Sequence, residues 1–321
     1  MAPSQRVRAV FMGTPEFAVP SLSEAHRLCD IVAVYTQPDR PVGRGLELKA
    51  PPVKLKALEL GIPVFQPEKL SAPGEFERLA ALQPELILVV AYGQILRQNV
   101  LDLPSLGCVN VHSSILPRWR GAAPIQWAIL AGDAETGVST QRMVMKLDAG
   151  DVLALEKTAI SPEETAQSLH DRLAQLGAGV LARTIEGLVS GTLQGVPQDE
   201  SRVTIASKLT REMERLDPSC TIAELDRRIR ALNPWPGTSV FLAETGERLK
   251  VKRALLRSEV RSKPGFLFES DGKLFLGASD GCLEVLQLQA EGKRVQSATE
   301  FLSGLRGRQN SGSHPFQWKL V

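Results

Sequence analysis

The first half of the chain alternates short apolar runs with stretches of helical periodicity. The runs are rich in Val, Ile or Leu and fall at residues 6–12, 31–36, 62–65, 86–91 and 108–112. Helical patterns separate several of them, and such alternation is typical of a mostly parallel sheet with helices on both faces. We therefore predict an α/β, Rossmann-like first domain.

The end of the first apolar run carries signals for a helix start. Gly13 supplies a turn, Thr14 an N-cap, and Pro15 a residue suited to the first helical position. A glycine between a strand and a helix also occurs in dinucleotide-binding folds. Only Gly13 is present here, without the second and third glycines that let a pyrophosphate approach, and this disfavours a dinucleotide site.

A second helix start lies at residues 161–164, where Ser161 and Glu164 form a capping box around Pro162. Apolar residues follow at helical spacing, at Leu169, Leu173, Leu176 and Val180. This pattern predicts a long helix that starts at Pro162, is open to interruption near the glycines at 177 and 179, and closes the first domain.

The pattern changes after residue 190. Residues 191–208 mix Gly, Pro, Gln, Asp and Ser with little periodicity, which indicates an extended linker with a boundary near 205. A capping box at residues 221–224 then opens a helix with an apolar stripe. Strand candidates separated by turns follow at 238–243, 248–255, 273–277 and 282–289, with a closing helix at 298–305. We predict domains at 1–190 and 209–321, the second a small antiparallel barrel.

Composition supports two domains, because 321 residues exceed the usual size of one. A hydrophobic content of 43% and a charged content of 23% are ordinary for a soluble globular protein. The four cysteines lie far apart, which indicates neither a zinc site nor a disulfide framework. No secretory signal and no apolar stretch of membrane-spanning length is present, so we expect a cytoplasmic protein without a membrane partner.

Charge is distributed unevenly along the chain. Residues after position 205 include 19 basic and 14 acidic side chains, which leaves 19 and 22 before it. The C-terminal part is therefore +5 and the N-terminal part −3, within a total of +2. This mild asymmetry is explained equally well by an ordinary solvated surface. The asymmetry would indicate a binding surface in the C-terminal part if the substrate were a polyanion.

Three side chains form the strongest candidate for chemistry. Asn110 and His112 alternate on one predicted strand, so both project from the same face near its carboxyl end, where open sheets bind ligands. Asp148 lies 36 residues after His112, between strands predicted at 137–143 and 152–160. When an amine attacks a carbonyl, fixed donors stabilise the charge on oxygen and a carboxylate can accept the proton. A lone His or Asp is usually structural, so the hypothesis rests on the joint pattern.

That pattern resembles the folate-dependent formyltransferase family, whose hallmark is an Asn, a His two positions later, a Ser-Leu-Leu-Pro-like loop and a downstream Asp-x-Gly. The corresponding residues here are Asn110, His112, Ser114-Ile115-Leu116-Pro117 and Asp148-Ala149-Gly150. Segments at 12–18, 37–41 and 117–126 are similar to the methionyl-tRNA branch of the family, and the likeness covers essentially the whole chain. It implies transfer of a formyl group from 10-formyltetrahydrofolate to the methionine amino group of initiator methionyl-tRNA, for translation initiation.

The resemblance also implies roles for individual residues. Asn110, His112 and Asp148 would be catalytic, and Ser114, Ile115, Leu116 and Pro117 would contact the folate cosubstrate, without a metal. The first domain would be the formyltransferase catalytic domain and the second an OB-like, tRNA-binding barrel. We expect the protein to act as a monomer.

Candidate tRNA contacts come from two regions. Residues 37–52 hold four prolines and two glycines, so we predict a loop without regular structure. In the resembled family an inserted loop here reaches the acceptor arm of the tRNA, which implicates Arg40, Arg44 and Lys49. In the second domain, Arg248, Lys250 and Lys252 would share one face of a strand and suit an RNA backbone.

Two alternatives stay open. The same Asn, His and Asp constellation could transfer a formyl group to a sugar nucleotide or to a glycinamide ribonucleotide, although the C-terminal extension and the proline-rich loop disfavour both. The chain could also be a noncatalytic RNA-binding protein, against which the three intact polar residues argue.

Overall fold

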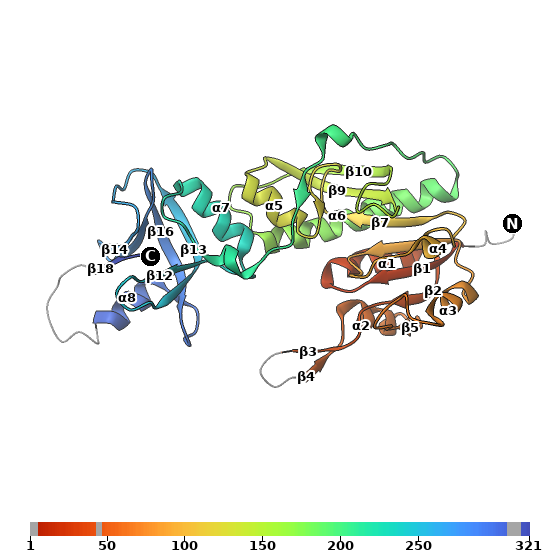
Figure 1. The fold of residues 1–321 in the computed structure, drawn as a ribbon, viewed down its shortest axis with the longest axis horizontal. Coiled ribbons are helices and arrows are strands. Elements are labelled where there is room, and N and C mark those ends of the chain that lie inside the picture. Colours follow the sequence, from red (N-terminus) through yellow and green to blue (C-terminus); the bar gives the residue numbers. More distant parts are fainter. Residues whose placement is uncertain (1–5, 43–46, 307–315) are drawn as a thin grey trace. The chain divides into compact units, whose positions relative to one another are not determined.

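A computed structural model of the chain describes residues 6–42, 47–306 and 316–321 (Figure 1). Within them the chain forms two compact units. The first comprises residues 6–42 and 47–124 with Glu135–Ala159 and Leu169–Ala206, and the second comprises Ile125–Ala134 and Ile160–Ser168 with residues 207–306 and 316–321. Two short segments of the predicted first domain thus belong to the second unit. The domain limits at residues 190 and 208 stay a prediction.

The first unit is built on a seven-stranded sheet with the order β10-β9-β7-β6-β1-β2-β5. Five strands are parallel, namely β1 (Arg8–Gly13), β2 (Asp30–Tyr35), β5 (Val64–Phe65), β6 (Leu86–Val90) and β7 (Cys108–His112). The strand β9 (Glu135–Arg142) runs antiparallel to β7, and the edge strand β10 (Val152–Ala159) runs antiparallel to β9, so β10 has the direction of the five parallel strands. The predicted fold class is confirmed, and each of these strands falls on or beside a predicted apolar run.

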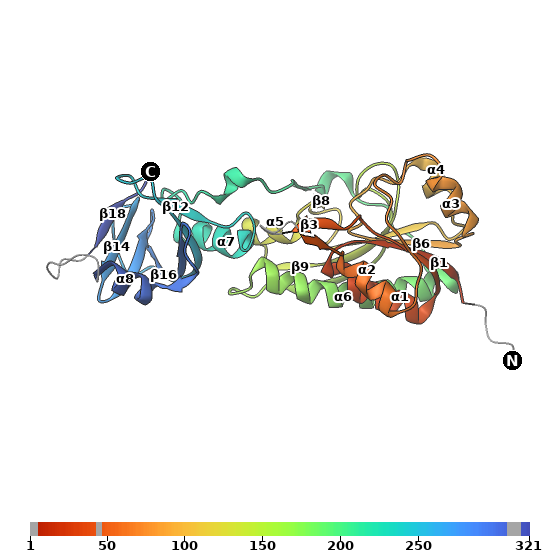
Figure 2. The ribbon, with the colours of Figure 1, turned by 90° about the horizontal axis from the view of Figure 1, so that it is seen from below.

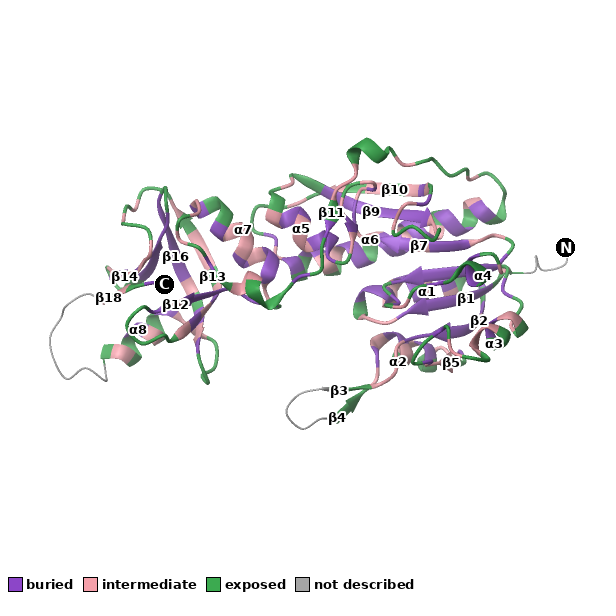
Figure 3. Ribbon diagram, in the orientation of Figure 1, coloured by how far each residue is buried: buried purple, intermediate pink, exposed green. Residues whose placement is uncertain are grey.

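Both faces of the sheet are covered. The continuous apolar runs of β1 and β6 are buried on both sides, and Figure 3 shows this for β1. Alternate residues such as Val10, Met12 and Ile87 form one core cluster with side chains from α3 (Glu75–Ala81) and α4 (Gln98–Leu101). Along the other face lie α1 (Val19–Leu28), α2 (Pro52–Glu59) and α6 (Ala166–Val189) (Figure 2). No helix in the described ranges is long and apolar enough to cross a membrane.

Thr14 does not cap a helix, contrary to the prediction. The chain first forms the short 3-10 helix η1 (Glu16–Ala18), whose N-cap is Pro15, and α1 follows. The Thr14 hydroxyl donates instead to the Tyr92 carbonyl oxygen at 3.0 Å and accepts from the Gln37 backbone N–H at 3.3 Å. Because Tyr92 follows β6 and Gln37 follows β2, this threonine links the ends of three neighbouring strands.

The long helix α6 begins at Ala166, four residues later than predicted. Glu164 does accept from the Ser161 backbone N–H at 3.1 Å, but this bond closes a turn. The cap is formed by Thr165 and Ser168, whose hydroxyls each accept the other's backbone N–H, at 3.2 Å and 3.0 Å. A second capping pair therefore overrides the first.

Neither glycine interrupts α6. A Cβ atom added at Gly177 would lie 3.2 Å from Val111 Cγ1, so the missing side chain lets the helix lie close to β7. At Gly179 an added Cβ would meet no atom within 4 Å. Gly177 thus has a packing role against the strand that carries Asn110 and His112, whereas Gly179 has none of that kind.

The second unit is a closed antiparallel barrel. Its strand order is β12 (Ser239–Phe241), β13 (Arg248–Arg257), β16 (Cys282–Ala290), β15 (Lys273–Gly277), β14 (Phe266–Ser270) and β18 (Gln317–Lys319), with β17 (Gln296–Ser297) beside β16. A bridge between Leu242 and Leu320 joins the first strand to the last. The OB-like class is confirmed, although β14 and β18 were not anticipated. The core also receives α7 (Ile222–Leu232), with the predicted capping box at Thr221, and α8 (Ala298–Arg306).

Two segments predicted to be irregular contain short strands. Within residues 37–52, β3 (Arg40–Val42) and β4 (Glu47–Lys49) pair antiparallel, so the prediction of a structureless loop was wrong. In the linker, β11 (Ile205–Ala206) pairs in parallel with β8 (Arg120–Gly121). The remaining elements are α5 (Pro124–Ala131), η2 (Glu200–Arg202) and η3 (Arg211–Glu214). Backbone pairing, within the segment for β3 and β4 and with distant residues for β11, forms these strands, and local composition does not reveal it.

The two glycines of α6 give a test of this packing. Gly179→Ala should raise the free energy of unfolding by about 0.5–1 kcal/mol, because alanine is the better helix former and the added methyl group is unopposed. Gly177→Val should lower it by about 1–3 kcal/mol, because its side chain must enter the space of Val111. Denaturant midpoints of the two variants check this, and equal shifts would contradict close packing of α6 on β7.

Candidate active site

The strand β7 presents two different faces. Val111 points toward α6, whereas Cys108 belongs to the opposite face, where its Sγ lies 3.6 Å from the Val100 carbonyl oxygen of α4. Residues two apart in a strand share a face, so Asn110 and His112 lie on the side of Cys108. His112 is 7% exposed and Asn110 is half-buried. The core thus anchors one face of the strand and leaves polar groups at the carboxyl end of the other.

Asp148 meets His112 in space. It lies on the connection between β9 and β10, and its Oδ2 is 3.8 Å from His112 Nδ1, with both side chains nearly buried. Asp148 has a φ of 48°, in the left-handed region that non-glycine residues rarely adopt. The structure therefore brings together two of the three predicted catalytic residues across 36 positions of sequence.

The Asp148 carboxylate is held at both oxygens. Gln141 Nε2 donates to Oδ1 at 3.0 Å, and the Gly121 backbone N–H donates to Oδ2 at 2.9 Å. Gln141 pairs with Asn110 across the β7–β9 ladder, which places the third predicted residue beside this network. The sequence analysis did not identify Gln141; its position in a strand beside β7 was the available signal.

The imidazole of His112 is oriented by a backbone carbonyl. Its Nε2 lies 2.9 Å from the Trp119 carbonyl oxygen, and because a carbonyl can only accept, Nε2 carries the hydrogen. The Trp119 residue itself has a φ of 61°. In the neutral ring the lone pair is then on Nδ1, the atom that faces Asp148.

The loop at residues 114–117 is largely occupied by its own hydrogen bonds. The Ser114 hydroxyl donates to the Arg118 carbonyl oxygen at 2.6 Å, and the Leu116 backbone N–H donates to Ser139 Oγ at 3.1 Å. Ser114 and Leu116 are buried, whereas Ile115 and Pro117 are half-buried. The two half-buried residues are the members of this loop best placed to contact a ligand.

The linker contributes a further polar network beside Asp148. Gln198 and Arg120 lie at its centre, and Arg120 is only 3% exposed. Hydrogen bonds from Arg120 and Lys146 lower the pKa of Glu200 to about 2, so this carboxylate is ionised at neutral pH. The sequence analysis missed Gln198, because it interpreted residues 191–208 only as a connection, and it gave Arg120 no role although the segment 117–126 was noted as similar to the family.

The predicted tRNA contacts fall on two separate elements. Arg40 and Lys49 lie on the exposed hairpin of β3 and β4, where Arg40 pairs with Glu68 at 3.2 Å. Arg44 lies outside the described residues. Arg248, Lys250 and Lys252 are half-buried on β13 and alternate with the buried residues 249 and 251, as expected for one face of a strand. Burial and then the nearby charge of Lys250 lower the pKa of Lys252.

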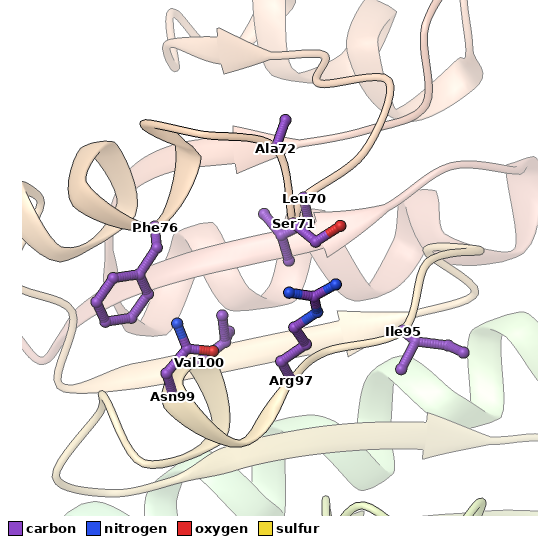
Figure 4. Close-up of a pocket in the computed structure, with 8 residues that line it drawn as sticks. All are labelled: Leu70, Ser71, Ala72, Phe76, Ile95, Arg97, Asn99 and Val100. Carbon is purple, nitrogen blue, oxygen red and sulfur yellow. The ribbon is translucent and has the colours of Figure 1, made fainter.

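Among the described residues, no group of three His, Cys, Asp or Glu side chains could hold a metal ion. A cavity of about 60 Å³ is lined by Phe76, Arg97 and Asn99 among others (Figure 4), and none of Asn110, His112 and Asp148 lines it. Small-molecule sites usually enclose about 300–1,000 Å³. That cavity is therefore too small for a folate.

The α/β fold and the polar cluster at the carboxyl end of β7 suit a group-transfer enzyme, and comparison with known proteins shows the family. Residues 7–185 match the formyl transferase family, and residues 208–306 match the formyl transferase C-terminal domain. The chain belongs to the formyl transferase family. The resemblance predicted from the sequence is thereby confirmed.

Individual relatives cover nearly the whole chain. It is 48% identical to the methionyl-tRNA formyltransferase of Myxococcus xanthus over 311 residues, which are 97% of this chain and 98% of that protein. It is 49% identical to the methionyl-tRNA formyltransferase of Halorhodospira halophila over 301 residues, 93% of this chain and 96% of that protein. Among solved structures, the N-formyltransferase of Helicobacter canadensis in complex with folinic acid and dTDP-3-aminofucose has a TM-score of 0.65 at 18% identity, covering 88% and 100% of the two chains. That last likeness supports the fold.

Proposed function

We propose that this chain transfers the formyl group of 10-formyltetrahydrofolate to the α-amino group of initiator methionyl-tRNA, and so supplies formylmethionyl-tRNA for translation initiation. The observation that carries the proposal is the approach of His112 and Asp148 to 3.8 Å. Identity of 48% with a methionyl-tRNA formyltransferase over 97% of the chain supports the choice of acceptor. The cytoplasmic location and the monomeric state stay predictions.

Asn110 and His112 act as donors to the formyl oxygen, on which negative charge grows as the amine attacks. Because the Trp119 carbonyl engages Nε2 of His112, a hydrogen bond from this ring to the oxygen comes from Nδ1–H. Both ring nitrogens carry hydrogens only in the imidazolium form. The carboxylate of Asp148, 3.8 Å from Nδ1, stabilises that cation.

Asp148 accepts the proton that the amine loses. A free α-amino group has a pKa of about 7.7–8.0, so an appreciable fraction is unprotonated near neutral pH and can attack. The new bond joins the amine nitrogen to the formyl carbon, and the nitrogen then loses a proton to Asp148 directly or through water. The bond from the formyl carbon to the folate nitrogen breaks, and that nitrogen takes up a proton.

The folate cosubstrate supplies the one-carbon unit. The residues fit such a group, because the half-buried Asn110 carboxamide and the His112 imidazole can both donate at the carboxyl edge of the sheet. In the loop at residues 114–117, we assign the folate contacts mainly to Ile115 and Pro117, since the polar groups of Ser114 and Leu116 are engaged within the protein.

The polyanionic part of the substrate contacts basic side chains of both units. Arg40 and Lys49 offer exposed charges on the β3–β4 hairpin, and Arg44 is assigned to the same group from the resemblance alone. On the barrel, Arg248, Lys250 and Lys252 form a basic stripe on one face of β13. Burial, and then the nearby charge of Lys250, lower the pKa of Lys252, and the negative charge of a bound phosphate would oppose both effects.

Transfer of a labelled formyl carbon tests the function directly. The protein is incubated with labelled 10-formyltetrahydrofolate and methionyl initiator tRNA, and we expect label in the tRNA-bound methionine. Parallel reactions offer a dTDP-amino sugar or glycinamide ribonucleotide as acceptor. Transfer to either of these, with none to the tRNA, would reject the proposed acceptor.

His112→Ala should lower turnover by about 10² to 10³-fold, because it removes one donor to the developing oxyanion. The measurement is kcat under saturating concentrations of both substrates, with circular dichroism to confirm folding. A folded His112→Ala protein with nearly normal turnover would contradict the assignment.

Asp148→Asn should abolish proton removal by this side chain and so reduce turnover to a small residual rate, while the affinity for tRNA changes little, because the carboxamide keeps the shape but cannot act as a base. Turnover and tRNA binding are measured separately on the same preparation. The role of Asp148 would be wrong if binding were lost and the turnover of bound substrate remained.

Replacement of Arg248, Lys250 and Lys252 by Ala should weaken tRNA binding and flatten its dependence on salt, because fewer counterions are released. Replacement of Lys263, Lys293 and Arg294 by Ala removes the same charge from the same unit and serves as the control. Binding is titrated over a range of salt concentrations. Equal effects of the two triple variants would show that net charge, and not this stripe, governs binding.

A further inference from the structure

Gln198 of the linker donates to the backbone beside Asp148. Its Nε2 lies 2.9 Å from the Asp148 carbonyl oxygen and 2.7 Å from the Gly150 carbonyl oxygen. A third and longer contact, at 3.4 Å, joins the same nitrogen to Oε1 of Gln141, whose own amide holds the Asp148 carboxylate. One side chain from residue 198 thus reaches both the backbone and the side-chain support of the proposed base.

Arg120 fixes which way the Gln198 amide faces. Its Nε and Nη2 lie 3.0 Å and 2.9 Å from Gln198 Oε1. A guanidinium can only donate, so the amide oxygen must face Arg120 and the amide hydrogens must face the carbonyls. Arg120 in turn donates to Glu200 at 2.8 Å, and Glu200 accepts from Lys146, which belongs to the same loop as Asp148, at 2.7 Å.

The backbone that Gln198 holds is a tight turn. Asp148 has a φ of 48°, and a Cβ atom added at Gly150 would lie only 1.7 Å from the Arg142 carbonyl oxygen. A left-handed backbone conformation is unfavourable for a residue other than glycine, and it persists where the surroundings stabilise it. Because the backbone direction at Asp148 determines where its carboxylate points, the bonds from Gln198 act on the orientation of that carboxylate.

The linker also contacts Trp119 and Arg120, and the carbonyl oxygen of Trp119 orients His112. The Trp119 backbone N–H donates to Thr204 Oγ1 at 2.8 Å, and the Arg120 backbone N–H donates to the Thr204 carbonyl oxygen at 2.9 Å. Trp119 is a second left-handed residue, and its carbonyl oxygen accepts from the His112 ring. Two linker residues therefore contact the two chain segments that orient the histidine and the aspartate.

We propose that the linker is a positioning element of the active site, in which Gln198 orients Asp148 and Thr204 orients His112. This inference rests on the proposed function and names residues that act through the catalytic groups. Neither linker side chain is assigned a contact with substrate. The expected signature of Gln198 is a loss of kcat at nearly constant KM, since it aims a catalytic group and binds neither substrate.

Three single variants test the role of Gln198. Gln198→Ala should lower kcat by about 10 to 100-fold, the scale expected for displacement of a catalytic group by about 1 Å, with KM for both substrates nearly unchanged. Gln198→Glu should cost as much, because a carboxylate can still accept from Arg120 but cannot donate to the two carbonyls. Gln194→Ala changes an exposed glutamine of the same linker and should behave as the wild type.

A double-mutant cycle separates positioning from a general structural effect. If Gln198 acts through Asp148, then Gln198→Ala should lower the residual single-turnover rate of Asp148→Asn by less than about twofold. If the two losses multiply, Gln198 acts independently of Asp148 and the inference is wrong. Thermal midpoints of all variants are compared, so that a folding defect is recognised.

Thr204→Val provides a second variant of nearly the same shape, for use if the Gln198 variants do not fold. It removes the acceptor for the Trp119 N–H and should lower kcat without a matching loss of tRNA affinity. Wild-type kcat in both Gln198→Glu and Thr204→Val would overturn the inference. The proposed function is judged separately, by transfer from the wild-type protein to methionyl-tRNA, so the two failures are distinguishable.

Discussion

The geometry of the polar cluster depends on one backbone turn, in which Asp148 adopts a left-handed conformation between β9 and β10. Such a conformation costs a non-glycine residue about 1–2 kcal/mol. Four hydrogen bonds reach this turn and its carboxylate, from Gly121, from Gln141 and twice from Gln198. At about 0.5–1.5 kcal/mol each, they can offset the cost. The turn is therefore stabilised by hydrogen bonds from residues in three other parts of the chain.

The two faces of β7 have different roles. One face packs against α6 closely enough that a Cβ atom at position 177 would lie only 3.2 Å from Val111, and the other presents Asn110 and His112. Rigid support on one side helps the polar groups on the other to keep their positions. The parallel strands β6 and β1 continue this support away from the site, with their residues buried on both faces.

Much of the fold could be predicted from the sequence, because buried parallel strands are continuous apolar runs and the barrel strands are separated by turn residues. Helix starts were less predictable. The signals at Thr14 and Ser161 are local, but contacts elsewhere in the fold decide the outcome. The Thr14 hydroxyl bonds to the end of a neighbouring strand. At the start of α6, a cap at Thr165 replaces the one predicted at Ser161. The proximity of His112 and Asp148 could be inferred from the family pattern, but not from spacing. Gln198 carried no signal, since a single glutamine in an aperiodic segment looks the same whether it faces solvent or a carbonyl.

The thiol of Cys108 lies on the same strand face as Asn110 and His112, directed toward α4. Burial raises its pKa to about 12, so almost none of it is thiolate at neutral pH. Oxidants and alkylating agents react with the thiolate, and the enclosing core also denies them access. A polarisable sulfur can thus fill space at the start of β7 without exposing the strand to oxidative damage, and the enzyme should tolerate a shift toward oxidising conditions at this position.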